Sequence, residues 1–329
     1  MFLFCYYRSY IGFTVHWLNP ETLESYSKGL ACRRIFGRHT FDNLAECIDK
    51  VINEFKLKNK VTLIVTDNAA NFVKAFRVFN SDNEQGTVDD GIDVTDLNEI
   101  PVNVEVTDLL ESQDIESSFC FSLPPHQRCA AHTLNLIATV DANDAEKDAA
   151  YKAISKKVFS KCQAIFNKQN QSTMSADKIK DHLGRYIITP NATRWNSYYD
   201  AMKCIMINID KINELCIELQ LPPISSPREV SFLKEYCDVM KPIAKALDLL
   251  QGVKFISLGY LLPTINAIHK ALNEIINVNL CKPLVIALKR GLNKRYYKYY
   301  VLFKYLLAVI NVYFFILLRL FIEMLNQVF

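Results

Sequence analysis

The sequence lacks the short motifs that mark most enzyme active sites. It has no glycine-rich phosphate-binding loop, no Gly-x-Ser-x-Gly nucleophile turn and no His-Glu-x-x-His metal motif. Its ten cysteines include no Cys-x-x-Cys pair, so the usual spacing of zinc ribbons and dithiol redox sites is missing as well. Cys129 lies three residues before His132, a separation at which we expect no productive alignment of a thiol with its base.

The amino-terminal segment does not resemble a secretory signal. MFLFCYYRSYIGF has neither a basic n-region nor a small-residue cleavage site. We therefore expect the scattered cysteines to be reduced thiols in a cytosolic or nuclear protein.

Whole segments lack one sign of charge. Acidic residues are absent from residues 1–20 and 275–322, and residues 78–127 contain no Lys or Arg. Within that last range, Ser81–Ser118 carries twelve acids, and its few apolar residues follow no period. We therefore predict a disordered acidic loop over residues 80–125. The net charge of +3 by itself says nothing about nucleic acid.

One stretch combines a strand pattern with a helix pattern. Val61–Val65 is typical of a short buried strand, and a helical pattern begins at Asn71 after Thr66, Asp67 and Asn68. An Asp at the carboxyl end of such a strand is where α/β folds place chemistry. The alternative is that Asp67 or Asn68 only caps the helix.

The flanking segments extend an α/β pattern. Residues 1–19 read as strand, Ser25–Ile35 as a second or third strand that returns, and His126–Leu136 as a strand with the start of a helix. Thr40–Phe55 is predicted to be an amphipathic helix capped by Thr40 or Asp42. Its apolar face is expected to carry Leu44, Ile48, Val51 or Ile52, and Phe55.

From about residue 142 the pattern becomes helical. Asp148–Asn167 is basic on one side and apolar on the other, and Trp195–Leu219 is predicted to be one long amphipathic helix. Val230–Leu250 and Tyr260–Ile276 are two further helices, with Pro263 in the first turn of the second, where its missing N–H costs little. The sequence thus predicts an α-helical domain inserted into an α/β core.

Three stretches resemble, in order and spacing, segments of hAT-family transposases. VTLIVTDNAANFVKAFRV (61–78) is similar to the strand and helix that carry the second catalytic Asp of the family. RCAAHTLNLIA (128–138) resembles its Cys-x-x-His signature, and NATRWNSYYDAM (191–202) resembles the Arg-Trp motif of its helical insertion. Residues 8–19 and 236–272 also look like family segments. The resemblance covers residues 8–300 and implies a ribonuclease-H-like core with an all-α insertion.

The resemblance implies a chemistry that this chain carries only in part. Transposases of this type hold two divalent metal ions, about 3.5–4 Å apart, with three carboxylates. Asp67 matches the second acid, but the first should precede Arg8 and the third should follow the insertion, and no matching acid stands in either place. The chain therefore looks truncated at both ends of the catalytic core. We expect no cofactor, and at most weak metal binding by Asp67; Mg²⁺ or Mn²⁺ is expected only if the chain is part of an active enzyme.

A zinc site is the remaining metal hypothesis. His126, Cys129 and His132, with Cys120 nearby, follow three-residue steps, whereas a zinc knuckle presents four tetrahedral ligands at other spacings. We instead expect Cys129 and His132 to be buried and to position the strand beside Asp67.

Two groups of residues are candidates for contact with DNA. The resemblance implies that Trp195, next to Arg194, holds a distorted base at a transposon end; the alternative is an ordinary core Trp. A second group interleaves basic and aromatic side chains, which can neutralise phosphates and stack on bases. The alternative for this second group is a solvated helix face whose tyrosines pack inward. Its members are Lys282, Lys289, Arg290, Lys294, Arg295 and Lys298, with Tyr296, Tyr297, Tyr299 and Tyr300.

The predicted domains are a core in two parts (1–79 and 126–145), the acidic loop (80–125), the helical insertion (146–300) and a hydrophobic tail (301–329). The leading hypothesis is a nuclear, transposase-derived, catalytically incomplete protein that binds nucleic acid or another partner and can form homo-oligomers. One alternative is a fragment of an active hAT DNA transposase, which cuts and joins DNA strands with metal ions. The other is a protein attached to a membrane by Val301–Phe329. Because the uncharged run in this tail, Tyr305–Leu318, is 14 residues long and a spanning helix needs about 20, we do not expect a functional membrane span.

Overall fold

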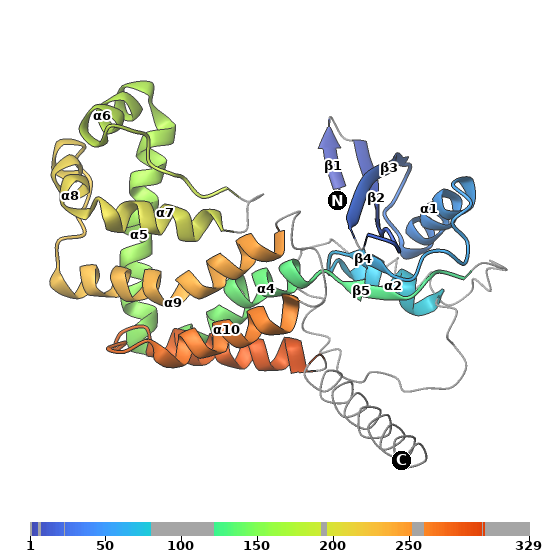
Figure 1. Cartoon of the computed structure of the whole chain (residues 1–329). Coiled ribbons are helices and arrows are strands. Elements are labelled where there is room, and N and C mark those ends of the chain that lie inside the picture. Colours follow the sequence, from blue (N-terminus) through green and yellow to red (C-terminus); the bar gives the residue numbers. More distant parts are fainter. Residues whose placement is uncertain are drawn as a thin grey trace, which may run out of the picture. The chain divides into compact units, whose positions relative to one another are not determined.

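The chain divides into two compact units, Met1–His132 and Thr133–Phe329. The structure, a computed structural model, describes residues 2–5, 8–22, 24–79, 122–191, 196–251, 260–297 and 299 (Figure 1). Strands and helices mix in the first unit and the second is built from helices, as the coarse prediction had it. The tail and all but the last four residues of the predicted acidic loop lie outside the described residues. Among the helices that the structure describes, none is long and apolar enough to cross a membrane.

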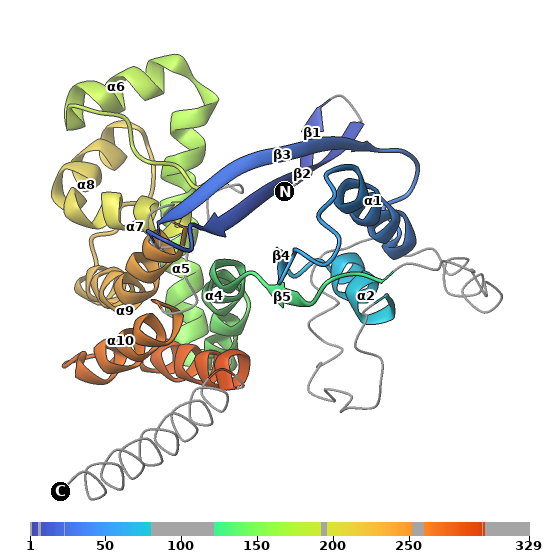
Figure 2. The same ribbon diagram turned by 45° about the vertical axis from the view of Figure 1, so that its right-hand side comes forward.

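The first unit contains two small β-sheets. β1 (Phe2–Cys5), β2 (Arg8–Leu18) and β3 (Ser25–Ile35) form an antiparallel sheet in that order. β2 and β3 make a long hairpin, seen from its side in Figure 2. β4 (Ile64–Thr66) and β5 (His126–Arg128) pair in parallel. Parallel neighbours need a crossover connection, and α2 (Ala70–Val78) lies in it.

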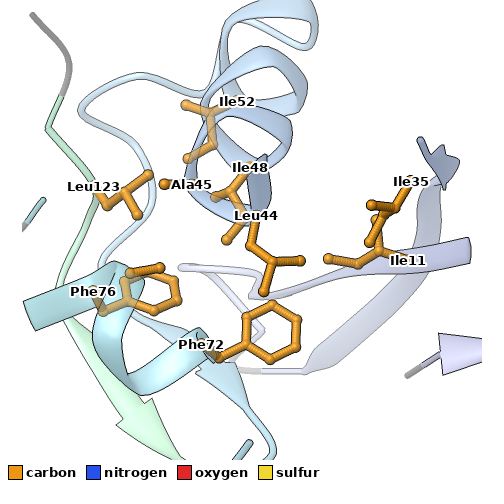
Figure 3. Close-up of a cluster of buried hydrophobic side chains, with 10 residues drawn as sticks. Ile11, Ile35, Leu44, Ala45, Ile48, Ile52, Phe72, Phe76 and Leu123 are labelled. Carbon is orange, nitrogen blue, oxygen red and sulfur yellow. The ribbon is translucent and has the colours of Figure 1, made fainter. Parts of the chain in front are cut away.

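Two helices close the core of this unit. α1 (Phe41–Glu54) is capped by Thr40, whose Oγ1 accepts a hydrogen bond from the N–H of Asn43 at 3.4 Å, so Thr40 rather than Asp42 is the cap. The apolar face of α1 meets that of α2 and one side of the antiparallel sheet in a single cluster (Figure 3). This cluster includes Ile11, Ile35, Leu44, Ala45, Ile48, Ile52, Phe72, Phe76 and Leu123.

Two expectations for the first unit are wrong. Phe55 does not join the buried face of α1: the helix ends before it, Lys56 takes a positive φ of 53°, and Phe55 is 39% exposed. Val61–Val65 is not a buried strand, because β4 begins only at Ile64 and Leu63 and Val65 are 44% and 57% exposed. Successive side chains of a strand point to opposite faces, so only Ile64 reaches the core cluster.

The boundary between the units falls within α4 (Ala130–Thr139), whose residues from Thr133 onward belong to the second unit. The 3₁₀ helix η3 (Asp141–Lys147) follows. α5 (Ala149–Gln171) is capped by Asp148, whose Oδ1 accepts a hydrogen bond from the N–H of Tyr151 at 2.8 Å. The other described helices are α6 (Thr173–Leu183), α7 (Ser197–Ile207), α8 (Ile209–Glu218), α9 (Pro227–Gln251), α10 (Leu261–Glu274) and a helix over 282–297. α9 packs against α5, α7 and α10 (Figure 1), and Pro263 lies in the first turn of α10 as predicted.

The single helix predicted over Trp195–Leu219 is interrupted. α7 ends at Ile207 and α8 begins at Ile209, because Asn208 leaves helical geometry with φ −110° and ψ 25°. Its side-chain amide donates to the carbonyl of Cys204 at 2.8 Å, a local bond that competes with the helix backbone. The apolar stripe continues across the break, and Met202, Ile205 and Ile212 are fully buried.

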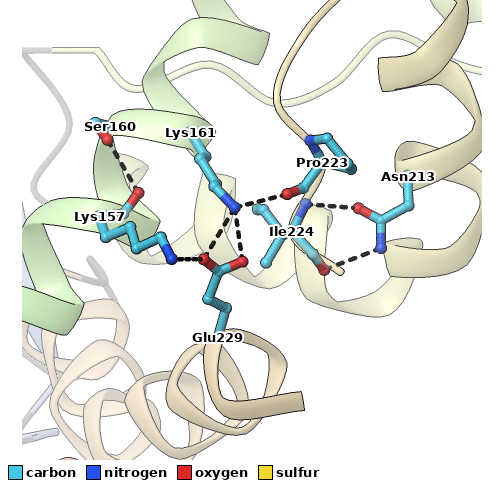
Figure 4. Close-up of polar contacts among 7 residues, drawn as sticks. All are labelled: Lys157, Ser160, Lys161, Asn213, Pro223, Ile224 and Glu229. Atoms are coloured by element: carbon cyan, nitrogen blue, oxygen red, sulfur yellow. Dashed lines mark hydrogen bonds and ion pairs between the residues drawn. The ribbon is translucent and has the colours of Figure 1, made fainter. Parts of the chain in front are cut away.

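A buried ion pair joins α5 to α9. The carboxylate of Glu229, 2% exposed, accepts hydrogen bonds from Lys161 Nζ at 2.7 and 2.9 Å and lies 3.0 Å from Lys157 Nζ. Lys161 also donates to the carbonyl of Pro223 at 2.7 Å (Figure 4). The lysines on the basic side of α5 therefore include at least one with a structural role.

Candidate functional site

Asp67 stands directly after β4 and before α2. Its Oδ1 accepts a hydrogen bond from the N–H of Ala69 at 3.2 Å. Ala69 itself is the N-cap of α2 and makes no side-chain cap bond. The carboxylate therefore closes the turn ahead of the helix and does not cap its first turn, and it is only partly buried.

The strand beside Asp67 is held by three contacts. The imidazole of His126 stacks on Phe76, with centroids 4.2 Å apart and planes 5° apart. The Nε2 of His126 lies 2.8 Å from the hydroxyl of Thr66, and the backbone N–H of Cys129 donates to the carbonyl of Thr66 at 2.7 Å. Cys129 thus fixes the strand through its backbone, whereas the prediction that Cys129 and His132 are buried is wrong. Both are partly exposed, because they stand where β5 ends and α4 begins.

The described residues contain no group of three or more His, Cys, Asp or Glu side chains placed to hold a metal ion. Cys120, the fourth member of the zinc hypothesis, lies outside them. The predicted ligands that the structure does describe, Asp67, His126, Cys129 and His132, therefore form no such group. Partners for Asp67 in a two-metal site would have to come from elsewhere.

The cysteines whose side chains the structure describes are free thiols. Burial raises the pKa of Cys162 and of Cys237 to about 12, and that of Cys216 to about 11. Raised pKa values keep these thiols protonated at neutral pH, which disfavours the thiolate form that acts as a nucleophile.

Arg194 and Trp195 lie outside the described residues, but the residues on either side of them are well held. Asn191 and Ser197 are joined by two hydrogen bonds, from the Ser197 hydroxyl to the Asn191 carbonyl at 2.6 Å and from the Asn191 N–H to that hydroxyl at 3.0 Å. The side chain of Asn196 donates to the Ala244 carbonyl at 2.8 Å and to Asp248 at 2.7 Å.

The basic residues predicted to contact nucleic acid on helix 282–297 have different environments. Arg295 is 6% exposed and donates to both carboxylate oxygens of Asp141, at 2.6 and 2.9 Å. A buried bidentate pair is structural, so the assignment of Arg295 to nucleic-acid contact is not supported by its environment. Arg290 is 63% exposed and lies 3.5 Å from Asp144, whose pKa is lowered mainly by its hydrogen bond to Lys147. Lys294 is exposed and Lys289 is partly exposed.

The tyrosines of this helix also divide. Tyr296 is fully buried, as in the alternative of inward-packing tyrosines, whereas Tyr297 is 68% exposed. The basic residues of this helix that remain exposed for contact with phosphates are therefore Lys282, Arg290 and Lys294, and Tyr297 is exposed on the same helix.

A pocket in the helical unit was not foreseen from the sequence. It has a volume of about 300 Å³ and is lined by aromatic rings from α5, α7 and α9, together with Glu146, Asn143 and Asn196. The rings come from segments far apart in the chain, so the spacing of residues within one segment could not predict the pocket. The pair Tyr198 and Tyr199, next to the Arg-Trp motif, was the sequence feature that pointed to this region.

Neither a scan against protein-family models nor a search of curated proteins finds a match to this chain.

Proposed function

We propose that the chain is a transposase-derived protein of the hAT type, which binds DNA through its helical unit and does not transfer strands by itself. The observation that carries the proposal is the connectivity of the first unit. Three antiparallel strands are followed by α1, then by β4, α2 and β5, with β4 and β5 parallel. This is the order expected of a ribonuclease-H-like core, and Asp67 stands at the end of β4, where the resemblance expects an acid.

The surroundings of Asp67 support the proposal that the chain binds DNA without catalysing strand transfer. Two metal ions need carboxylates from separate elements on both sides of the reacting phosphate. Asp67 has the N–H of Ala69 on one of its oxygens, and no other described acid gathers with it into a metal-binding group of three. An active transposase whose other acids lie outside this chain is the competing proposal, and Mg²⁺ or Mn²⁺ would belong to it.

The basic helix gives the proposed contact with DNA. Lys282, Arg290 and Lys294 are exposed on one helix, and each cation that meets a phosphate releases condensed counterions. Arg295 contributes indirectly, because its pair with Asp141 anchors the helix to η3. Arg194 and Trp195 remain proposed contacts on the strength of the resemblance alone.

The test is fluorescence anisotropy of the full chain with labelled single- and double-stranded DNA over a range of salt concentrations. The double variant Lys282→Gln/Lys294→Gln should weaken binding, and the slope of log K against log salt should fall by roughly 0.9 for each phosphate that the protein no longer neutralises. The matched control, Lys58→Gln/Lys60→Gln, removes two exposed charges from the first unit. An equal loss of affinity in both double variants would mean that net charge, and not this helix, holds the DNA.

A further inference from the structure

Three rings in the helical-unit pocket stand at nearly right angles to one another. They belong to Phe159 on α5, Tyr198 on α7 and Tyr236 on α9, and all three line the pocket. The planes of Phe159 and Tyr198 are 78° apart, those of Phe159 and Tyr236 are 74° apart, and those of Tyr198 and Tyr236 are 89° apart. The three centroid separations are 5.7, 5.0 and 6.5 Å in the same order.

Three perpendicular rings, each about 4.5 Å from a common point, have centroids about 6.4 Å apart, and a cation within about 6 Å of a centroid is attracted by the ring face. The separation of Tyr198 and Tyr236 fits three walls around one enclosed group, whereas Phe159 lies closer to both rings. Edge-to-face packing of aromatic rings produces similar pairwise angles without any ligand. The composition of the rest of the pocket distinguishes the two cases.

The charge on the pocket wall is negative. Glu146 is the charged side chain among the described lining residues, which include no Lys, Arg or His. Lys152 lies 3.9 Å from Glu146, with both side chains about half exposed, so this ion pair is weak and leaves the carboxylate able to attract a second cation. A phosphate or carboxylate ligand would be repelled at this wall, so the pocket does not suit the DNA backbone.

We propose that this pocket binds an organic cation with a methylated ammonium head group, enclosed by Phe159, Tyr198 and Tyr236 and attracted by Glu146. The head group is too weakly hydrated to resist transfer into an aromatic enclosure, and it needs no hydrogen-bond acceptor there. A volume of about 300 Å³ lies at the lower end of ligand pockets and suits a compact head group with a short chain. The same head group occurs on methylated lysine in proteins and on free choline-type molecules. This proposal does not rest on DNA binding.

The test is calorimetric titration of the full chain with choline, with a short peptide containing trimethyllysine, and with 3,3-dimethylbutan-1-ol, the uncharged isostere of choline. Saturable binding of at least one cation is expected, with the isostere binding about three- to thirtyfold more weakly than choline if choline binds. For the peptide, the matched control is the same peptide with unmodified lysine. Binding of the trimethyllysine peptide alone would identify a protein source, and binding of choline alone a free small molecule. Absence of binding by both cations, or equal binding of each cation and its control, would overturn the proposal.

Two variants test the site itself. Phe159→Leu removes one wall and should weaken cation binding about three- to thirtyfold, whereas Tyr186→Leu, which removes an exposed ring that does not line the pocket, should leave it unchanged. Glu146→Gln keeps the shape of the side chain and removes its charge, and because Glu146 is about half exposed this variant should fold. It therefore tests the proposal even if Phe159→Leu unfolds the protein. Unchanged cation affinity in folded Glu146→Gln would contradict the proposed role of that carboxylate and with it the proposal.

Discussion

At the scale of single residues, burial decides which charges are structural. Glu229 and Arg295 have side chains 2% and 6% exposed, and each is enclosed by opposite charge. In the sequence, Arg295 is indistinguishable from the exposed cations of its helix, because nothing in residue type reveals that Asp141, far away in the chain, lies against it. For the same reason, the sequence alone could not predict that Lys161 pairs with Glu229.

We predict that Glu229→Gln strongly destabilises the helical unit. The amide keeps the volume but leaves Lys161, 16% exposed, without its counter-charge, and breaking a buried pair in this way typically costs about 3–5 kcal/mol. Urea denaturation followed by circular dichroism measures the destabilisation. Glu46→Gln is the control, because its pair with Lys50 on α1 is solvent-exposed and should contribute little. Equal midpoints for the two variants would show that the Glu229 pair is not a stabilising one.

Acid should weaken the same interaction. Burial raises the pKa of Glu229, but the hydrogen bonds and charges of Lys161 and Lys157 outweigh it and hold the pKa below the ordinary value of 4.5. A carboxyl with a lowered folded-state pKa stabilises the fold fully above its unfolded pKa, and this contribution is lost as pH falls through the folded pKa. The difference in unfolding free energy between the wild type and Glu229→Gln should therefore shrink below about pH 4.5. A difference that stays constant down to about pH 3 would contradict this assignment.

At the scale of elements, the sequence predicted those helices whose apolar face repeats without interruption. α1, α5, α9 and α10 were all expected, and Leu44, Ile48, Val158 and Ile165 are buried as their spacing indicates. The errors arose where one local bond outweighs periodicity, as at Asn208, or where a strand is shorter than its apolar run, as at β4. The candidate site was less predictable, because the pocket rings meet only through the packing of α5, α7 and α9.

We predict that Gly291→Ala destabilises the contact between η3 and helix 282–297. A Cβ at this position would lie 2.6 Å from Asp141 Oδ2 and 2.8 Å from Asp141 Cβ, so the carboxylate that holds Arg295 would have to move. Alanine favours a helix by about 1 kcal/mol over glycine, but overpacking typically costs about 1–3 kcal/mol and the displaced ion pair adds to that. The melting temperature should therefore fall. Gly29→Ala, which meets nothing within 4 Å, is the control, and a higher melting temperature for Gly291→Ala would contradict the prediction.

At the scale of the whole molecule, the two units place different chemistry in separate parts of the chain. The α/β unit presents Asp67 after a short parallel strand, and the helical unit presents exposed cations on one helix and an aromatic pocket with an acidic wall. The exposed cations attract negative charge and the acidic pocket attracts positive charge, so the two proposed ligands, DNA and an organic cation, would not compete for one surface.

We predict that the purified chain does not cleave or join DNA when Mg²⁺ or Mn²⁺ is supplied. Strand transfer needs acids from separate elements to hold two metal ions about 3.5–4 Å apart. Asp67 alone matches the resemblance, and one of its oxygens already accepts the N–H of Ala69. Nicking of supercoiled plasmid and joining of labelled oligonucleotides, each with and without metal, measure the activity. Asp67→Ala separates a genuine site from a contaminating nuclease: activity present in the wild type and abolished in this variant would mean that Asp67 has carboxylate partners within this chain, and the proposal of a binding protein without strand transfer would have to be abandoned.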